Sequence, residues 1–157
     1  MNHLQNKNKL TIKDATAIDQ SGQTPCLVSA CLVGLCTRYD AKIKRSASIP
    51  EIIQNSSWIP VCPEQLGGLP TPRPAADLVG GDGAAVLEGK ASVVSRNGVD
   101  VTPQFINGAR QCLSIARAQN INRAFLKSKS PSCGLSPQTG VTAALLQQHG
   151  IRVIEID

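Results

Sequence analysis

Three turns in the chain each place a cysteine just after a short apolar run. These cysteines are Cys31, Cys62 and Cys133. An α/β protein holds its reactive side chains in such turns, at the carboxyl ends of buried strands. We therefore expect the three thiols to converge at one edge of a sheet.

Three convergent thiolates without an equal fourth partner are typical of a metal centre with one open position. Thiolates favour iron–sulfur clusters, zinc or copper, and the wide separation of these cysteines does not match the paired spacing of a zinc finger. The spacing does not choose the metal, and each cysteine taken singly could be a small buried core residue. Cys36 is an alternative or fourth ligand, whereas Cys26 and Cys112 are expected to be packing residues.

Polar side chains accompany these cysteines. Glu64 follows Cys62 and a proline, so it could act as a general base beside a metal, cap a helix end, or form an ion pair with Arg73. Ser130 and Ser132 flank a proline, and their hydroxyls could bond the local backbone, as turn serines usually do, or face a ligand.

The apolar run over residues 26–33 has no polar alternation and predicts a strand that is buried on both faces, two shorter runs predict further buried strands, and a last run predicts a fourth strand. They alternate with three segments that show helical capping or periodicity, which is typical of a parallel sheet with right-handed crossovers. The predicted fold is α/β: a single, Rossmann-like domain with a mainly parallel sheet and helices on both faces. The predicted strands cover residues 26–33, 58–61, 123–126 and 151–154, and the predicted helices cover 49–54, 102–119 and 139–150.

Residues 63–98 are rich in Gly and Pro and predict a long irregular excursion from the sheet. Within it, residues 86–87 and 91–94 are expected to form a small ribbon, with a turn at Asn97-Gly98. Residues 1–25 are polar and predict a flexible extension. The α/β domain is therefore expected to cover residues 26–157.

The composition suits one soluble domain. Of 157 residues, 41% are hydrophobic and only 3% are aromatic, which requires an aliphatic core and argues against a protein that stacks nucleic-acid bases. No membrane span or signal sequence is visible, so we expect a cytoplasmic protein whose six cysteines do not form disulfides. The net charge of +5, with cations clustered over residues 38–45 and at Arg73, suits either an anionic ligand or a solvated basic face.

Four longer motifs give the chain a family resemblance. They read VSACLVGLCTRYD over residues 28–40, PVCPEQLGGLPTPRPAAD over 60–77, LKSKSPSCG over 126–134 and VTAALL over 141–146. In this order they resemble the thiouracil desulfidase family. The resemblance implies a redox-neutral desulfidase that holds a 4Fe-4S cluster by only three cysteines. Its substrate would be a small-molecule thiolated pyrimidine, namely 4-thiouracil or its nucleoside monophosphate.

The resemblance also implies a role for each site residue. Glu64 would take a proton from water, and Ser130 would hydrogen-bond or protonate the ring. The thiocarbonyl sulfur would bind the open iron, and its sulfide would stay on the cluster as a 4Fe-5S species before leaving as hydrogen sulfide. The implied cluster ligands are Cys31, Cys62 and Cys133, and further substrate contacts are expected from Ser29, Arg73 and Ser132.

One segment departs from the family pattern. Family members carry a longer loop with Gly and Tyr between the last two motifs, whereas only residues 135–140 intervene here, which bears on substrate preference and activity. Two other functions remain open: a non-catalytic metal or sulfur-carrier module, and a desulfidase of thiolated tRNA. The chain lacks an added RNA-binding domain, so a nucleic-acid partner is disfavoured. A monomer or a homodimer is expected.

Overall fold

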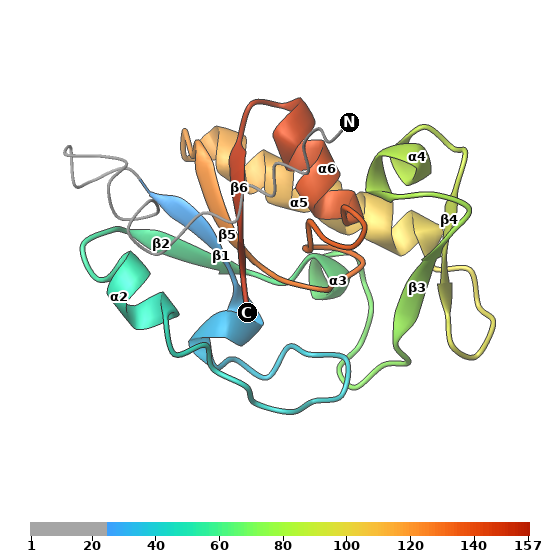
Figure 1. Ribbon diagram of the computed structural model, residues 1–157, viewed down its shortest axis with the longest axis horizontal. Coiled ribbons are helices and arrows are strands. Elements are labelled where there is room, and N and C mark those ends of the chain that lie inside the picture. The colour runs from blue at the N-terminus through green and yellow to red at the C-terminus, as the bar shows by residue number, and fades with distance from the viewer. Residues whose placement is uncertain (1–24) are drawn as a thin grey trace, which may run out of the picture.

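The computed structural model describes residues 25–157 and contains a four-stranded parallel sheet (Figure 1). The strand order is β2-β1-β5-β6. The register pairs Leu27 with Ile59 on one side and with Ala124 on the other. These observations confirm the predicted α/β class. The strands are β1 (Cys26–Ser29), β2 (Trp58–Val61), β5 (Arg123–Lys127) and β6 (Arg152–Ile156).

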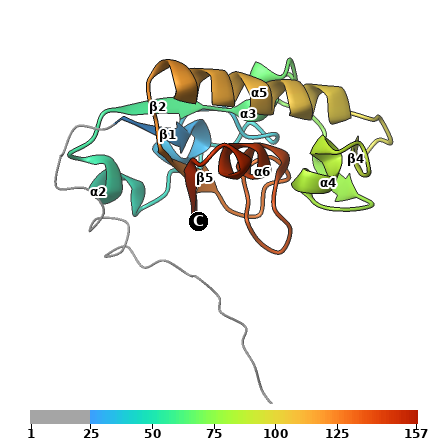
Figure 2. The ribbon, with the colours of Figure 1, turned by 90° about the horizontal axis from the view of Figure 1, so that it is seen from above.

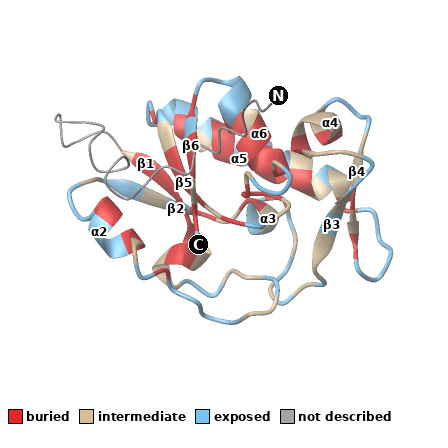
Figure 3. Cartoon of the chain, viewed as in Figure 1, coloured by how far each residue is buried: buried red, intermediate tan, exposed pale blue. Residues whose placement is uncertain are grey.

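Helices cover both faces of this sheet, as Figure 2 shows for α5 and α2. Alternate residues of each strand point to opposite faces, so Leu27 packs with α5 and α6, whereas Val28 packs with the short α2. The strands β1 and β5 are consequently the most deeply buried part of the fold (Figure 3). The helices are α2 (Ile49–Ile53), α5 (Thr102–Ala118) and α6 (Val141–Gln148).

The first strand is shorter than predicted. It ends at Ser29, and the chain continues as a 3-10 helix, η1 (Ala30–Val33), which closes at Gly34 with φ +90°. The neighbouring strand β2 ends at Val61, the partner of Ser29, so the backbone beyond Ser29 has no strand to pair with on that side. Cys31 therefore lies in a helical turn at the end of the sheet.

The segment over residues 63–98 leaves the four-stranded sheet as predicted, but it contains two short helices and two strands, so the prediction that it is irregular was wrong. The predicted pairing of residues 86–87 with 91–94 was also wrong, because β3 supplies the partner of β4, in antiparallel register. Val86 instead lies in α4, where it is 1% exposed in a small core with Phe105, and Asp82 caps that helix by accepting from Ala85 N at 3.0 Å. The segment contains α3 (Pro63–Leu66), β3 (Ala76–Val79), α4 (Gly83–Leu87) and β4 (Ser92–Ser95).

The predicted extension over residues 1–25 lies, except for its last residue, outside the described residues. Within residues 25–157, no helix is both long and apolar enough to span a bilayer.

Candidate active site

The three predicted cysteine turns meet at one cavity of about 320 Å³ at the carboxyl ends of β1, β2 and β5. Cys31 comes from η1, directly after β1. Cys62 follows β2 and is the N-cap of α3, and Cys133 lies in the turn after β5. Because parallel strands end at the same edge, segments far apart in the sequence bring their side chains to one place.

Burial raises the pKa of two of these thiols. It raises the pKa of Cys31, as does the nearby Cys62, while Arg38 and Lys127 lower it. It raises the pKa of Cys133 well above its ordinary value, and the hydroxyl of Ser29 offsets this only in part. A buried thiolate needs a positive partner, and a bound metal centre provides one.

The donor type of this cavity fits an iron–sulfur cluster, because thiolates are the ligands that such clusters prefer. Among residues 25–157, no three His, Cys, Asp or Glu side chains lie close enough to share one metal ion. In an iron–sulfur cluster each cysteine binds a different iron atom, so its ligands lie farther apart than those of one zinc ion. Cys31, Cys62 and Cys133 all line this one cavity, each from a different segment of the chain.

The other three cysteines lie outside this cavity. Cys36 is exposed, and its Sγ donates to the carbonyl of Ala41 at 3.3 Å. Cys26 and Cys112 are fully buried in apolar clusters on opposite faces of the sheet, which confirms them as packing residues.

Raising the pH from about 8 to about 11 is expected to destabilise the fold through these two packing thiols. Burial raises the pKa of Cys26 to about 11 and that of Cys112 to about 12, from an ordinary value of 9.0. Above pH 9 the unfolded chain loses protons that the folded chain keeps, so the free energy of unfolding falls by about 1.4 kcal/mol per pH unit for each group. Thermal unfolding should show a shallower pH dependence for Cys112→Ala than for the wild type. Equal slopes would contradict the prediction.

Glu64 lies in the first turn of α3, beside Cys62, and lines the cysteine cavity. Its Oε1 accepts a hydrogen bond from Ser132 Oγ at 3.1 Å, and its Oε2 accepts one from Arg73 Nε at 2.5 Å. The ion pair with Arg73, one of the alternatives for this residue, is therefore present, and the carboxylate still faces the cavity. Both oxygens keep a lone pair for a further donor.

Two glycines fix the position of α3 against α5. A Cβ at Gly67 would lie 2.0 Å from the carbonyl oxygen of Gln104, and one at Gly108 would lie 1.8 Å from that of Pro63. Only glycine permits this close approach of the two backbones. The carboxylate of Glu64 is thus carried on a rigidly packed turn.

The three serines of the cavity have different environments. Ser130 Oγ accepts from the backbone N–H groups of Ser132 and Cys133, both at 3.2 Å, so the local backbone bond is present. Its own hydroxyl proton is not used in those bonds. Ser132 is 2% exposed and donates to Glu64, and Ser29 is equally buried and accepts from Lys127 N at 2.9 Å.

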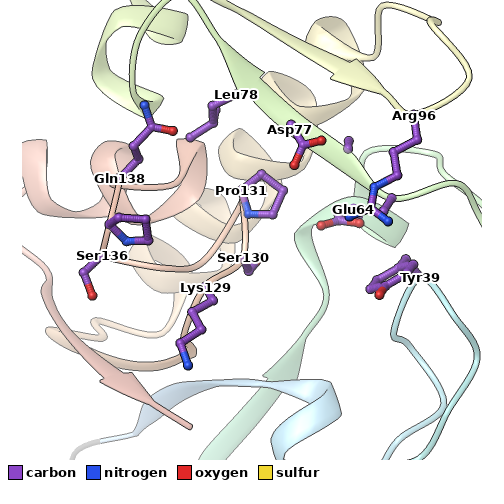
Figure 4. Close-up of a pocket in the computed structure, with 13 residues that line it drawn as sticks. Tyr39, Glu64, Asp77, Leu78, Arg96, Lys129, Ser130, Pro131, Ser136 and Gln138 are labelled. Atoms are coloured by element: carbon purple, nitrogen blue, oxygen red, sulfur yellow. The ribbon is translucent and has the colours of Figure 1, made fainter.

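A second cavity, of about 300 Å³, adjoins the first and shares Glu64 and Ser130 with it. Figure 4 shows Arg96 and Asp77 on its β3–β4 side and Gln138 on the opposite side, with Ser130 and Pro131 between them. The site is therefore elongated: a sulfur-lined end continues into a polar end.

All eight site residues predicted from the sequence lie together in the structure, since each of them lines the cysteine cavity. Sequence reasoning missed Lys127, Tyr39 and Arg96, which line one or both cavities. The position of Lys127 at the carboxyl end of a strand was a usable signal. Arg96 lies on the ribbon that was wrongly paired, so no sequence signal pointed to it.

The cations near the first cysteine turn divide into two groups. Arg38 lines the cysteine cavity, where its guanidinium pairs with Asp40 at 3.0 Å. The other group is exposed, which is consistent with a solvated basic face: Lys42, Lys44 and Arg45.

Comparisons with known proteins place the chain in a family. A family model described as 2-thiouracil desulfurase matches residues 26–157. The uncharacterized protein YbbK of Bacillus subtilis (strain 168) is 40% identical over 140 residues, which are 82% of this chain and 93% of that protein. The solved structure of a 4Fe-4S-dependent thiouracil desulfidase, TudS, is 37% identical with a TM-score of 0.67, covering 83% of this chain and 89% of that one. Because the family model spans most of its length and both relatives exceed 30% identity, this chain belongs to the 2-thiouracil desulfurase family.

Proposed function

We propose that this chain is an iron–sulfur-dependent desulfidase that hydrolyses the carbon–sulfur bond of 4-thiouracil or its nucleoside monophosphate. The observation that carries the proposal is the meeting of Cys31, Cys62 and Cys133 with Glu64 around one cavity. Family membership and the 4Fe-4S dependence of the solved relative support it. The reaction converts a thiocarbonyl and water to a carbonyl and hydrogen sulfide, so no electrons are gained or lost.

The three cysteines would hold a 4Fe-4S cluster and leave one iron without a protein ligand. When bound, such a cluster supplies a Lewis-acidic site with affinity for sulfur, which makes the thiocarbonyl carbon more electrophilic. The cysteines that line this cavity are Cys31, Cys62 and Cys133, which supports this arrangement.

The side chains of the site supply the proton transfers. Glu64, held by Arg73 and Ser132, takes a proton from the water that attacks the ring carbon. Ser130 keeps its hydroxyl proton for the substrate, because its oxygen already accepts two backbone N–H groups. The turn that carries Cys133 thus also carries a donor aimed at the same substrate.

Anaerobic reconstitution with iron and sulfide tests the proposal directly. The reconstituted protein is expected to be brown and to release sulfide and uracil from 4-thiouracil in equal amounts. A colourless, inactive protein would contradict the proposal. A protein that holds the cluster but turns over no thiolated pyrimidine would instead be a metal or sulfur-carrier module.

The second cavity is the place for the sugar and phosphate of a nucleotide substrate. Arg96 is a cation that lines this cavity, and Asp77 and Gln138 offer polar groups to a ribose. Arg96→Ala is expected to raise KM for 4-thiouridine monophosphate by about tenfold, since hydrogen bonds to charged groups contribute about 1.5–3 kcal/mol and this one is solvent-exposed. KM for the free base should not change.

Steady-state kinetics with both substrates measures this difference, and added salt should weaken the preference for the nucleotide. Arg110→Ala is the control, because Arg110 is exposed on α5 and lines neither cavity. An equal rise in KM for base and nucleotide would contradict the assignment of Arg96.

A further inference from the structure

Arg73 was expected to contact substrate, but its guanidinium is occupied by the protein. Its side chain is only 5% exposed. A guanidinium has five N–H donors, and each one here has an acceptor. The acceptors are Glu64 Oε2 at 2.5 Å, Pro70 O at 3.1 Å, Thr71 Oγ1 at 3.0 Å, Thr37 O at 3.0 Å and Cys62 Sγ at 3.8 Å.

Two of these contacts connect the proposed base, Glu64, to one of the proposed cluster ligands, Cys62. Nε of Arg73 donates to the carboxylate of Glu64, and Nη2 donates to the sulfur of Cys62. Cys62 precedes Glu64 by two residues in the chain. The Arg73 backbone is itself fixed, because its N–H donates to the carbonyl of Tyr39 at 2.8 Å. The guanidinium therefore has a defined position relative to both groups.

We propose that Arg73 is a positioning residue that sets the carboxylate of Glu64 against the sulfur of Cys62. It acts through these two side chains and does not contact substrate. The inference rests on the proposed function, because it assigns Glu64 as the base and Cys62 as a cluster ligand.

The planar shape of the guanidinium explains why an arginine is used. Its fork presents several N–H groups in fixed directions, so one side chain can hold a carboxylate and a sulfur at once. A lysine ammonium is a point charge on a flexible stem and cannot reproduce this geometry. A hydrogen bond to a cluster-ligating sulfur also stabilises the reduced cluster, which raises its reduction potential.

Activity measurements on reconstituted protein test the first contact. Arg73→Ala and Arg73→Lys are each expected to lower kcat by about 10–100-fold, the usual loss when an outer-shell partner is removed. Added guanidinium ion should restore part of the activity of Arg73→Ala. In a Glu64→Ala background, Arg73→Ala should lower the rate less than threefold further, because its partner is already absent.

The reduction potential of the cluster tests the second contact without reference to activity. Arg73→Ala should shift the potential to a more negative value, and the shift should persist in the Glu64→Ala background. Arg110→Ala is the matched control and should change neither kcat nor the potential. If Arg73→Ala does not fold, Arg73→Lys keeps the charge and decides the question by the same two readouts.

Three results would overturn the inference. One is wild-type activity and potential in Arg73→Lys. Another is an unchanged potential in Arg73→Ala, and the third is an undiminished effect of Arg73→Ala when Glu64 is absent. All three require an active, cluster-loaded wild type. A wild type that binds no cluster or releases no sulfide would instead refute the proposed function.

Discussion

Replacement of Glu64 by glutamine is expected to lower kcat for 4-thiouracil by about two to four orders of magnitude, the usual range for loss of a general base. Glutamine has the same shape, so its amide oxygen can still accept from Arg73, but it cannot take a proton from water. The side chain binds no iron in the proposed site, so the cluster should stay. Sulfide release and iron content, measured anaerobically on the same sample, separate the two effects.

Two further variants complete this experiment. Ser132→Ala removes the donor to Glu64 Oε1 and is expected to cost about tenfold in rate, as for one hydrogen bond to a charged group. Glu51→Gln makes the same chemical change at an exposed position of α2 and should change nothing. A cluster-loaded Glu64→Gln protein with more than about a third of the wild-type kcat would exclude Glu64 as the base.

The parallel sheet was predictable because its strands are short apolar runs. These runs are too short for helices, and they alternate with segments of helical pattern. Residues 123–126 lie in a strand as expected, and the helix over residues 102–119 is nearly the observed α5. Residues 58–61 also form a strand, but the prediction that it is buried was wrong, because β2 lies at the edge of the sheet and only Val61 is buried. The ribbon was not predictable, because Val86 and Leu87 are too few to show a period of either two or 3.6 residues. These residues form a helix because Val86 packs against Phe105 in a small core and because Asp82 caps the first turn.

The meeting of the cysteines was predictable from topology alone, since all three follow strands of one parallel sheet. The pairing of Glu64 with Arg73 was one of the alternatives, and only the structure shows that Ser132 shares the carboxylate. The complete use of the Arg73 donors was beyond sequence reasoning. It depends on the backbone carbonyl groups of Thr37 and Pro70. Every residue has such a group, so the sequence does not indicate which ones Arg73 contacts.

Each of the variants Cys31→Ala, Cys62→Ala and Cys133→Ala is expected to lose the cluster, whereas Cys36→Ala is expected to keep it. The proposed cluster has only three protein ligands, and among residues 25–157 no other cysteine lines the cavity to replace one. Iron and acid-labile sulfide per chain should fall by more than about tenfold, since even outer-shell losses cost 10–100-fold in metal affinity. Sulfide release from 4-thiouracil should fall with them.

Cys112→Ala separates ligand loss from general destabilisation. Cys112 packs in the same apolar cluster as Cys133 and is fully buried, so both variants remove one buried sulfur from one core. Both should therefore lower the Tm of the cluster-free protein by similar amounts, but only Cys133→Ala should lose iron. If Cys36→Ala loses the cluster and Cys133→Ala keeps it, the proposed ligand set is wrong. The exposed turn at Cys36 would then have to move into the cavity when the cluster binds, because its sulfur bonds Ala41 outside it.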